Sequence, residues 1–303
     1  MFAALAAGVY TLSVSADPGD TPPDGKHIGT KDNHGKGGPS GDAGGGRVQQ
    51  GSNGITYHGG PVLTSGSNVY YIWYGNWGAD TATTILPKLP VGLNASPYFN
   101  INTTYYDGSK TKVKNAVSLV AQYAYPSTTY GTSLTDANIQ AIVAGAINGG
   151  HLAYDASGVY FVLTSPEIKE TSGFCTKYCG WHTHFSLNGV NSQDVKYAFV
   201  GDSDTQCASS CEEQTSSSPN NNPGADGMAS VIAHELEEAT TDPGLNAWYD
   251  SRGYENADKC AWTFGTEKTA GNGSKYNMTL NGLNFLIQQN WVNASGGYCA
   301  LSY

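Results

Sequence analysis

The stretch "VIAHELEEATTDP", residues 231–243, sets the architecture expected for the whole chain. Apolar residues recur at helical spacing through it, and Pro243 cannot continue a helix. The pattern predicts a helix over residues 227–241 that enters the core along Met228, Val231, Ile232, Leu236 and Ala239. The same stretch holds a His-Glu-x-x-Glu motif. This is the spacing of a zinc-protease helix, with a carboxylate in place of the second histidine.

The motif predicts a metal site. His234 and Glu238 stand four residues apart and share one helical face, while Glu235 projects beside them toward a water molecule that the metal would activate. Nineteen residues separate Glu238 from Asp258. This is similar to the thermolysin type of site, in which a carboxylate on a following helix or turn completes the ligand set. Glu255 is the alternative third ligand.

Two further interpretations concern the same helix. Asp242 is expected to orient His234 or to hold the helix end. The competing interpretation of the whole stretch is a solvated acidic face, on which Glu235, Glu237 and Glu238 only flank the buried stripe.

The ligand types limit the metal and its chemistry. One histidine and two carboxylates give a divalent ion a net charge of zero, so water beside the ion should be less acidic than at a site with two histidines. Oxygen-rich ligation also weakens the preference for zinc over manganese or calcium. We therefore expect a divalent metal, with zinc first and manganese or calcium as alternatives, in a slow or specialised hydrolase.

The remaining periodic segments indicate an α+β fold with a mixed sheet and packed helices. Runs rich in β-branched and aromatic residues predict strands at 68–77, 158–165, 195–202 and 283–291. Apolar spacing of three and four predicts helices at 113–124 and 135–147, the second of which opens with Thr135 or Asp136 as N-cap.

The first 54 residues are expected to lie outside the folded domain. Residues 1–16 are apolar, end in small residues and are too short to span a bilayer, which is typical of a secretion signal. Residues 17–54 are rich in Gly and Pro and predict a flexible tail or a cleavable pro-segment. The folded domain should then be a single unit over 55–303. No later stretch is apolar for long enough to predict a membrane segment.

Charge narrows the class of partner. The 303 residues carry a formal net charge of −10, and no basic run reverses it. Nucleic acid and anionic membranes both bind basic surfaces, so the sequence argues against both as main partners.

Six cysteines, at 175, 179, 207, 211, 260 and 299, predict three disulfides in a secreted chain. The two C-x3-C pairs could close locally, with Cys260 joined to Cys299. The competing interpretation is a zinc cluster in "CTKYCGWHTH" formed by Cys175, Cys179, His182 and His184. The two histidines are also candidates to bind the ion of the helix site, or to donate to an oxyanion.

Several separated motifs, taken together and in order, resemble the EXORDIUM or phosphate-induced protein family of secreted, wall-associated proteins. They are "YHGGPV", "VYYIWYGNW", "GFCTKYCGWH", "KYAFVGDSDTQCASSC", "GADGM" and the single Cys299, and the resemblance spans nearly all of 55–303. It implies an extracellular location and no particular activity. The plant members lack His-Glu-x-x-Glu after "DGM", so the metal interpretation applies to a branch resembling microbial relatives that carry H-E-L-x-E and "TDP".

Two functions of different classes follow. The first is a secreted metal-dependent hydrolase, a peptidase in which Glu235 is the general base. The second is a noncatalytic extracellular module that binds cell-wall polysaccharide through exposed Trp and Tyr and holds at most a structural calcium.

Overall fold

The computed structural model describes residues 31, 54–126, 129–190 and 192–303. The expected signal at 1–16 lies outside the described residues, as does the expected tail apart from Lys31 and Gly54. No helix in the described part of the chain combines the length and the apolarity that a membrane crossing requires.

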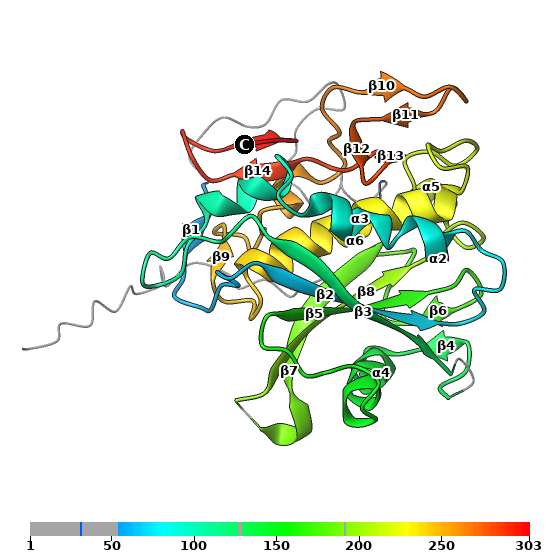
Figure 1. Ribbon diagram of the computed structural model, residues 1–303, viewed down its shortest axis with the longest axis horizontal. Helices are drawn as coiled ribbons and strands as arrows, with labels where there is room; N and C mark the ends of the chain where they lie inside the picture. The colour runs from blue at the N-terminus through cyan, green and yellow to red at the C-terminus, as the bar shows by residue number, and fades with distance from the viewer. Residues whose placement is uncertain (1–30, 32–53, 127–128, 191) are drawn as a thin grey trace, which may run out of the picture.

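A five-stranded mixed sheet forms the centre of the fold, with strand order β3-β2-β5-β8-β7 (Figure 1). The first four strands in this order are parallel to one another, and β7 is antiparallel to β8. The strands are β2 Ser67–Tyr74, β3 Val117–Tyr125, β5 Gly158–Thr164, β7 Gly180–Ser186 and β8 Asp194–Gly201. The sequence predicted β2, β5 and β8 correctly, because strands buried on both faces have nearly continuous apolar runs.

Helices cover both faces of this sheet (Figure 1). Helix α4, Asp136–Asn148, packs on the face that carries Tyr70 and Ile72. Helix α6, Pro223–Thr241, packs on the opposite face together with α2, Ala82–Ile85, and α3, Lys88–Leu93. The predicted α+β fold with a mixed sheet and packed helices is confirmed.

Two predicted helices are confirmed and one is wrong. Thr135 caps α4 through a reciprocal pair of hydrogen bonds with Asn138, and α6 starts four residues before the predicted bound, where Asn222 caps it. The segment 113–124 was expected to be a helix, but from Val117 onward it forms edge strand β3. Its burial alternates with period two, so the apolar spacing that suggested a helix arises from one half-exposed face of an edge strand.

The predicted strand at 283–291 is also wrong as a single element. It divides into β13, Leu283–Phe285, and β14, Asn290–Val292, and neither joins the central sheet. Between them Gln288 binds α6, because its backbone N–H and side-chain amide both donate to Ser230 Oγ, at 3.1 and 3.3 Å. The apolar run therefore packs against a helix instead of pairing within the sheet.

Short elements complete the fold. They are β1 Thr56–Tyr57, η1 Phe99–Thr104, β4 Ser133–Leu134, β6 Lys169–Glu170, η2 Leu187–Gly189, α5 Ala208–Cys211, β9 Trp248–Tyr249, η3 Asp258–Cys260, β10 Lys268–Thr269, β11 Lys275–Tyr276, β12 Met278–Leu280 and β15 Tyr298–Ala300.

All six cysteines form disulfides: Cys175–Cys207, Cys179–Cys211 and Cys260–Cys299. The pairing of Cys260 with Cys299 was predicted correctly, whereas local closure of the two C-x3-C pairs was wrong. The two segments precede β7 and follow β8, which are antiparallel neighbours, so each cysteine faces the other segment. The disulfides also exclude the Cys175, Cys179, His182, His184 zinc cluster, because no thiol remains to bind metal.

Strand β7 approaches α6 closely at Gly180. A Cβ atom added there would lie 2.5 Å from Val231 Cγ1 and 3.1 Å from Glu235 Oε1, and the first distance is shorter than any ordinary contact. Glycine therefore allows the contact that places the next residues of β7 beside the polar face of α6.

We expect Gly180→Ala to lower the free energy of unfolding by about 1–3 kcal/mol, as overpacking of a dense core does. Urea denaturation measures the change. Gly271→Ala is the matched control, because a Cβ at Gly271 meets nothing within 4 Å. Equal effects of the two substitutions would contradict the close packing of β7 on α6.

Candidate metal centre

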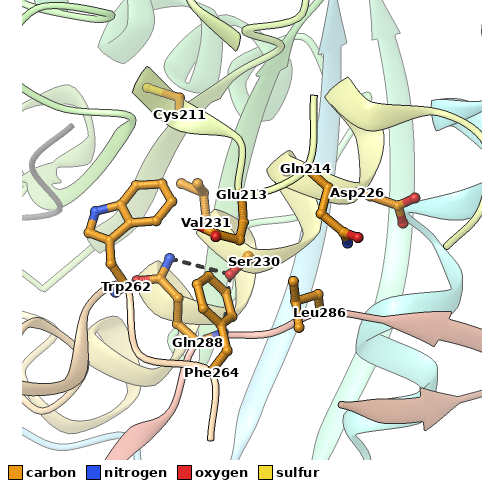
Figure 2. A pocket seen from close by; sticks show the side chains of 11 residues that line it. Cys211, Glu213, Gln214, Asp226, Ser230, Val231, Trp262, Phe264, Leu286 and Gln288 are labelled. Atoms are coloured by element: carbon orange, nitrogen blue, oxygen red, sulfur yellow. Dashed lines mark hydrogen bonds between the residues drawn. The ribbon is translucent and has the colours of Figure 1, made fainter. Parts of the chain in front are cut away.

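Helix α6 is buried along its whole length except at Pro223 and Gly227, and its polar residues therefore face other protein segments. Near its N-terminal end, Gly227, Ser230 and Val231 line a pocket of about 20 Å³ whose opposite wall holds Trp262 and Phe264 (Figure 2). The same side of α6 carries His234 and Glu235 one helical turn further on, and Glu238 two turns further on.

Lys31 contacts two residues that line this pocket. Its Nζ lies 2.9 Å from Glu213 Oε2 and 5.9 Å from the centre of the Trp262 ring. The same ammonium donates to the Glu212 carbonyl at 3.3 Å. An acidic group beside an aromatic face is a favourable environment for a lysine side chain.

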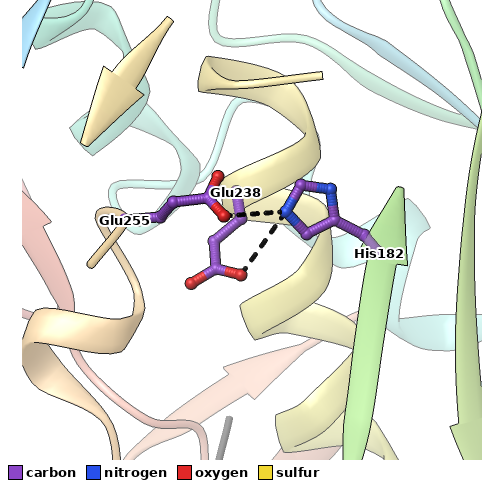
Figure 3. Close-up of side chains that lie close together, drawn as sticks. All are labelled: His182, Glu238 and Glu255. Carbon is purple, nitrogen blue, oxygen red and sulfur yellow. Dashed lines mark hydrogen bonds and ion pairs between the residues drawn. The ribbon is translucent and has the colours of Figure 1, made fainter. Parts of the chain in front are cut away.

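The structure brings His182 of β7 next to α6 (Figure 3). Its Nε2 lies 3.2 Å from Glu255 Oε2 and 3.7 Å from Glu238 Oε2. These three residues form one buried group that could hold a metal ion. Sequence reasoning gave His182 and Glu255 only as alternatives, because neither lies at a diagnostic spacing from the helix motif.

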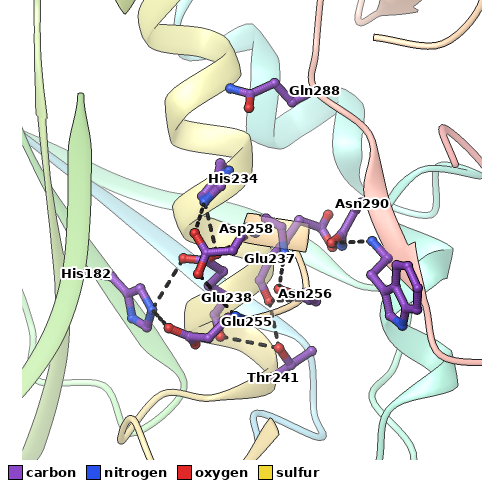
Figure 4. Close-up of polar contacts among 12 residues, drawn as sticks. His182, His234, Glu237, Glu238, Thr241, Glu255, Asn256, Asp258, Gln288 and Asn290 are labelled. Carbon is purple, nitrogen blue, oxygen red and sulfur yellow. Dashed lines mark hydrogen bonds and ion pairs between the residues drawn. The ribbon is translucent and has the colours of Figure 1, made fainter. Parts of the chain in front are cut away.

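His234, Glu238 and Asp258 form a second such group (Figure 4). His234 Nε2 lies 2.9 Å from Glu238 Oε1 and 3.5 Å from Asp258 Oδ1. These are the three residues that the sequence proposed as ligands, and the fold places them together. Their role as ligands remains a prediction.

One short turn of chain supplies both Glu255 and Asp258. The backbone N–H of Glu255 donates to Asp258 Oδ2 at 3.1 Å, and the N–H of Asp258 donates to Glu238 Oε1 at 3.0 Å. The Cys260–Cys299 disulfide fixes this turn two residues after Asp258. The hydrogen bond from the Asp258 N–H thus ties the turn to α6, and the disulfide ties it to β15.

Negative charge is concentrated at this centre. Glu235, Glu238, Glu255 and Asp258 surround two histidines, and each of the six side chains is at most 4% exposed. Burial, and then repulsion by Glu238 and its acidic neighbours, raise the pKa of Glu255 well above its ordinary value. Burial alone would lower the pKa of His234, but Glu238 and Asp258 outweigh it and raise that pKa well above its ordinary value.

The spacing of these atoms suits a bound cation. Two ligands at about 2.1 Å from a tetrahedral metal lie about 3.4 Å from each other, and the histidine-to-carboxylate distances here run from 2.9 to 3.7 Å. A divalent ion would also offset the repulsion among the buried carboxylates. The donor set and its geometry therefore fit a metal.

Most of the chain matches a known protein family. The sequence profile described as "Phosphate-induced protein 1 conserved region" matches residues 55–300. The chain belongs to this family. EXORDIUM-like 5 of Arabidopsis thaliana is 30% identical over 273 residues, which cover 78% of this chain and 75% of that protein. EXORDIUM-like 3 of the same plant is 30% identical over 253 residues, covering 75% and 73%.

A tobacco relative, PHOSPHATE-INDUCED 1 of Nicotiana tabacum, is 28% identical over 219 residues, covering 64% of this chain and 67% of that protein. No solved structure matches the chain. The resemblance drawn from separated motifs is thus confirmed, and the region that matches the phosphate-induced protein 1 family includes all six cysteines and both candidate ligand groups.

Other residues singled out from the sequence lie at the edge of the centre. His184, two residues beyond His182 on β7, pairs through Nδ1 with Asp194 Oδ1 at 2.6 Å. Asp242 ends α6, and its Oδ1 accepts hydrogen bonds from the backbone N–H groups of Asn246 and Ala247, both at 2.6 Å. Asp242 thus holds the helix end, the second of the two roles considered for it.

Removal of divalent metal should destabilise this protein, because the carboxylates of the centre then repel one another. With free Zn²⁺ or Mn²⁺ at a hundred times its dissociation constant, binding adds about 2.7 kcal/mol to the free energy of unfolding. Thermal unfolding with EDTA and with added metal measures the difference. Glu238→Gln should remove most of the metal dependence, and the exposed Glu267→Gln should preserve it. A metal-independent melting temperature in the unsubstituted protein would contradict a metal centre.

Proposed function

We propose that this member of the family is a secreted metal-dependent hydrolase that cleaves peptides, with His234, Glu238 and Asp258 as ligands and Glu235 as general base. The observation that carries the proposal is the position of Glu235. It belongs to neither ligand group, yet its charge acts on both His234 and Glu255. Its carboxylate also lies against Gly180 of β7, two residues before His182.

Each residue has a chemical part in this proposal. A divalent ion held here supplies Lewis-acid polarisation of a carbonyl and increases the acidity of water. Glu235 accepts the proton of the attacking water and passes it to the departing amine. Asp258, fixed by its hydrogen bonds to the Glu255 backbone and the Glu238 carboxylate, keeps the ligands in position. His182 and Glu255 border the reaction site on the side of β7.

The pocket beside the centre supports a peptide as substrate. Lys31 contacts it through an ion pair with Glu213 and through the face of Trp262. Ser230, which lines the pocket, stands one helical turn from His234. The basic side chain of a peptide would meet the same ion pair and aromatic face at the rim of this pocket, one helical turn from His234.

Secretion is supported by the disulfides. Three disulfides are typical of proteins that fold in an oxidising compartment. The expected signal at 1–16 supports the same location, as does the wall-associated family that the chain resembles.

Glu235→Gln tests the catalytic assignment, because it preserves shape while removing the basic carboxylate. We expect metal content to persist and hydrolysis of lysine-containing peptides to fall by two to four orders of magnitude. Metal analysis and single-turnover peptide cleavage measure the two quantities. His234→Ala should lose metal and activity together, and Glu267→Gln should change neither. Unchanged cleavage in Glu235→Gln would rule out the proposed general base.

A different observation favours a second candidate function, a noncatalytic module that binds wall polysaccharide. An open groove of about 580 Å³ lies where β2 and β3 end, and Trp73, Trp77, Tyr123 and Tyr125 line it. All its lining residues are uncharged, and Asn76 and Gln122 add amide groups. Aromatic faces with neutral hydrogen-bonding groups suit a sugar chain. If the protein is such a module, an ion bound among these buried side chains would have a structural role.

Binding to insoluble wall polysaccharide separates this candidate from the first. We expect Asn76→Ala and Gln122→Ala each to weaken binding about fivefold to tenfold, as the loss of one hydrogen bond does. Co-sedimentation with the polysaccharide gives the affinity. The control is Gln140→Ala, an exposed position on α4. Equal binding by all four proteins would exclude the groove as the glycan site.

A further inference from the structure

Glu238 faces two histidines with two different oxygens. Its Oε1 lies 2.9 Å from His234 Nε2, and its Oε2 lies 3.7 Å from His182 Nε2. Each histidine has its own second carboxylate, Asp258 for His234 and Glu255 for His182. The two candidate ligand groups therefore share only Glu238, and each oxygen of its carboxylate serves one of them (Figures 3 and 4).

We propose that this centre holds two divalent cations bridged by Glu238, the first bound by His234 and Asp258 and the second by His182 and Glu255. The inference rests on the metal centre of the proposed function and adds a second ion to it. Bridged two-metal sites place their ions about 3.5–4 Å apart, and they are common in enzymes that hydrolyse phosphate and peptide bonds. The second ion would lie on the β7 side of the centre.

Charge balance favours two ions over one. Glu235, Glu238, Glu255 and Asp258 carry four negative charges when ionised, and all four are buried. One divalent ion offsets only two of these four charges, and a buried carboxylate that lacks a counter-charge costs several kcal/mol. Two divalent ions with neutral histidines make the centre neutral. A single divalent ion together with protonated Glu255 and His182 would also make the centre neutral. The experiment below distinguishes this one-ion case from the two-ion case.

The second group is built for a ligand and not only for an internal ion pair. Glu255 is only 1% exposed, so water does not solvate its carboxylate. Its Oε1 also accepts no hydrogen bond from the described residues. A buried carboxylate oxygen in that position is costly unless a cation or a proton reaches it. The close approach of β7 at Gly180 brings His182 within reach of this carboxylate.

The two groups also share one supporting turn. Asp258 and Glu255 come from the same turn, in which the Glu255 N–H donates to Asp258 Oδ2. A single rigid segment thus presents one carboxylate to each histidine. This arrangement would hold the two ions at a fixed separation.

Metal stoichiometry tests the proposal. The purified full chain is stripped with chelator, loaded with Mn²⁺, freed of excess ion and analysed for metal per chain. We expect two equivalents in the unsubstituted protein, one in His182→Ala and one in Glu255→Gln, and a loss of both sites in Glu238→Gln. His184→Ala should retain two, because His184 lies on the same strand but pairs with Asp194.

Electron paramagnetic resonance provides a readout that does not depend on any variant folding. Two Mn²⁺ ions bridged by one carboxylate give an exchange-coupled spectrum, whereas a single ion gives the six-line pattern of isolated Mn²⁺. A coupled spectrum in the unsubstituted protein supports the bridge even if His182→Ala fails to fold.

The remaining outcomes overturn the inference in distinguishable ways. One equivalent that survives in His182→Ala and is lost in His234→Ala removes the second site and leaves the proposed metal centre intact. One equivalent lost in both variants means a single ion bound by both histidines. No bound metal in the unsubstituted protein removes both the second ion and the proposed function.

Discussion

The burial of a charged helix is the constraint on which the rest of the structure depends. Helix α6 runs through the core between the sheet and the C-terminal segments, and it carries one histidine and three glutamates within residues 234–238, little more than one helical turn. An ionised carboxylate in such a place costs several kcal/mol unless something compensates it. The fold provides two different kinds of compensation on two sides of the same helix.

On one side, Glu237 receives a hydrogen bond from a neutral amide. Asn290 Nδ2 donates to its Oε2 at 2.6 Å, and burial raises the pKa of Glu237 well above its ordinary value. Glu237 is thus suited to stay protonated. On the other side, Glu238 faces Glu255, Asp258 and two histidines. The ionised carboxylates there repel one another, and each histidine can share a proton with a carboxylate. Among the residues that the structure describes, only this second side has the donor types and the spacing of a metal site.

Two of the disulfides lie close to the candidate ligands in the sequence. Cys179 precedes His182 by three residues and is bound to Cys211, while Cys260 follows Asp258 by two residues and is bound to Cys299. Both segments that approach α6 with ligands are therefore covalently fixed close to those ligands. In the chain-entropy description, each such link stabilises the fold by about 3–4 kcal/mol. Oxidation of these cysteines therefore helps to fix the positions of the candidate ligands, and disulfides of this kind form in oxidising compartments.

The sequence predicted the parts of this arrangement that depend on local pattern. Helix α6, His234 and Glu238 follow from spacing within one element. The Cys260–Cys299 pair was what remained once each C-x3-C pair was expected to close locally, so it was correct although that expectation was wrong. His182 and Glu255 were only alternatives, because their proximity depends on the approach of β7 at Gly180, which no local pattern records. The segment 113–124 was mistaken for a helix for a related reason. Its place as the edge strand β3 depends on pairing with β2, and pairing with a distant strand overrides the helical spacing.

The pocket and the candidate metal centre are built on the same two segments. Helix α6 gives Ser230 to the pocket and His234 to the centre, and the segment after the ligand-bearing turn gives Trp262 to the pocket four residues beyond Asp258. Gln288 links these two segments. Its Oε1 accepts a hydrogen bond from the backbone N–H of Trp262 at 2.6 Å, and its own backbone N–H donates to Ser230 Oγ. The hydrogen bonds of Gln288 thus tie the pocket wall to the helix and to the segment that carry the candidate ligands.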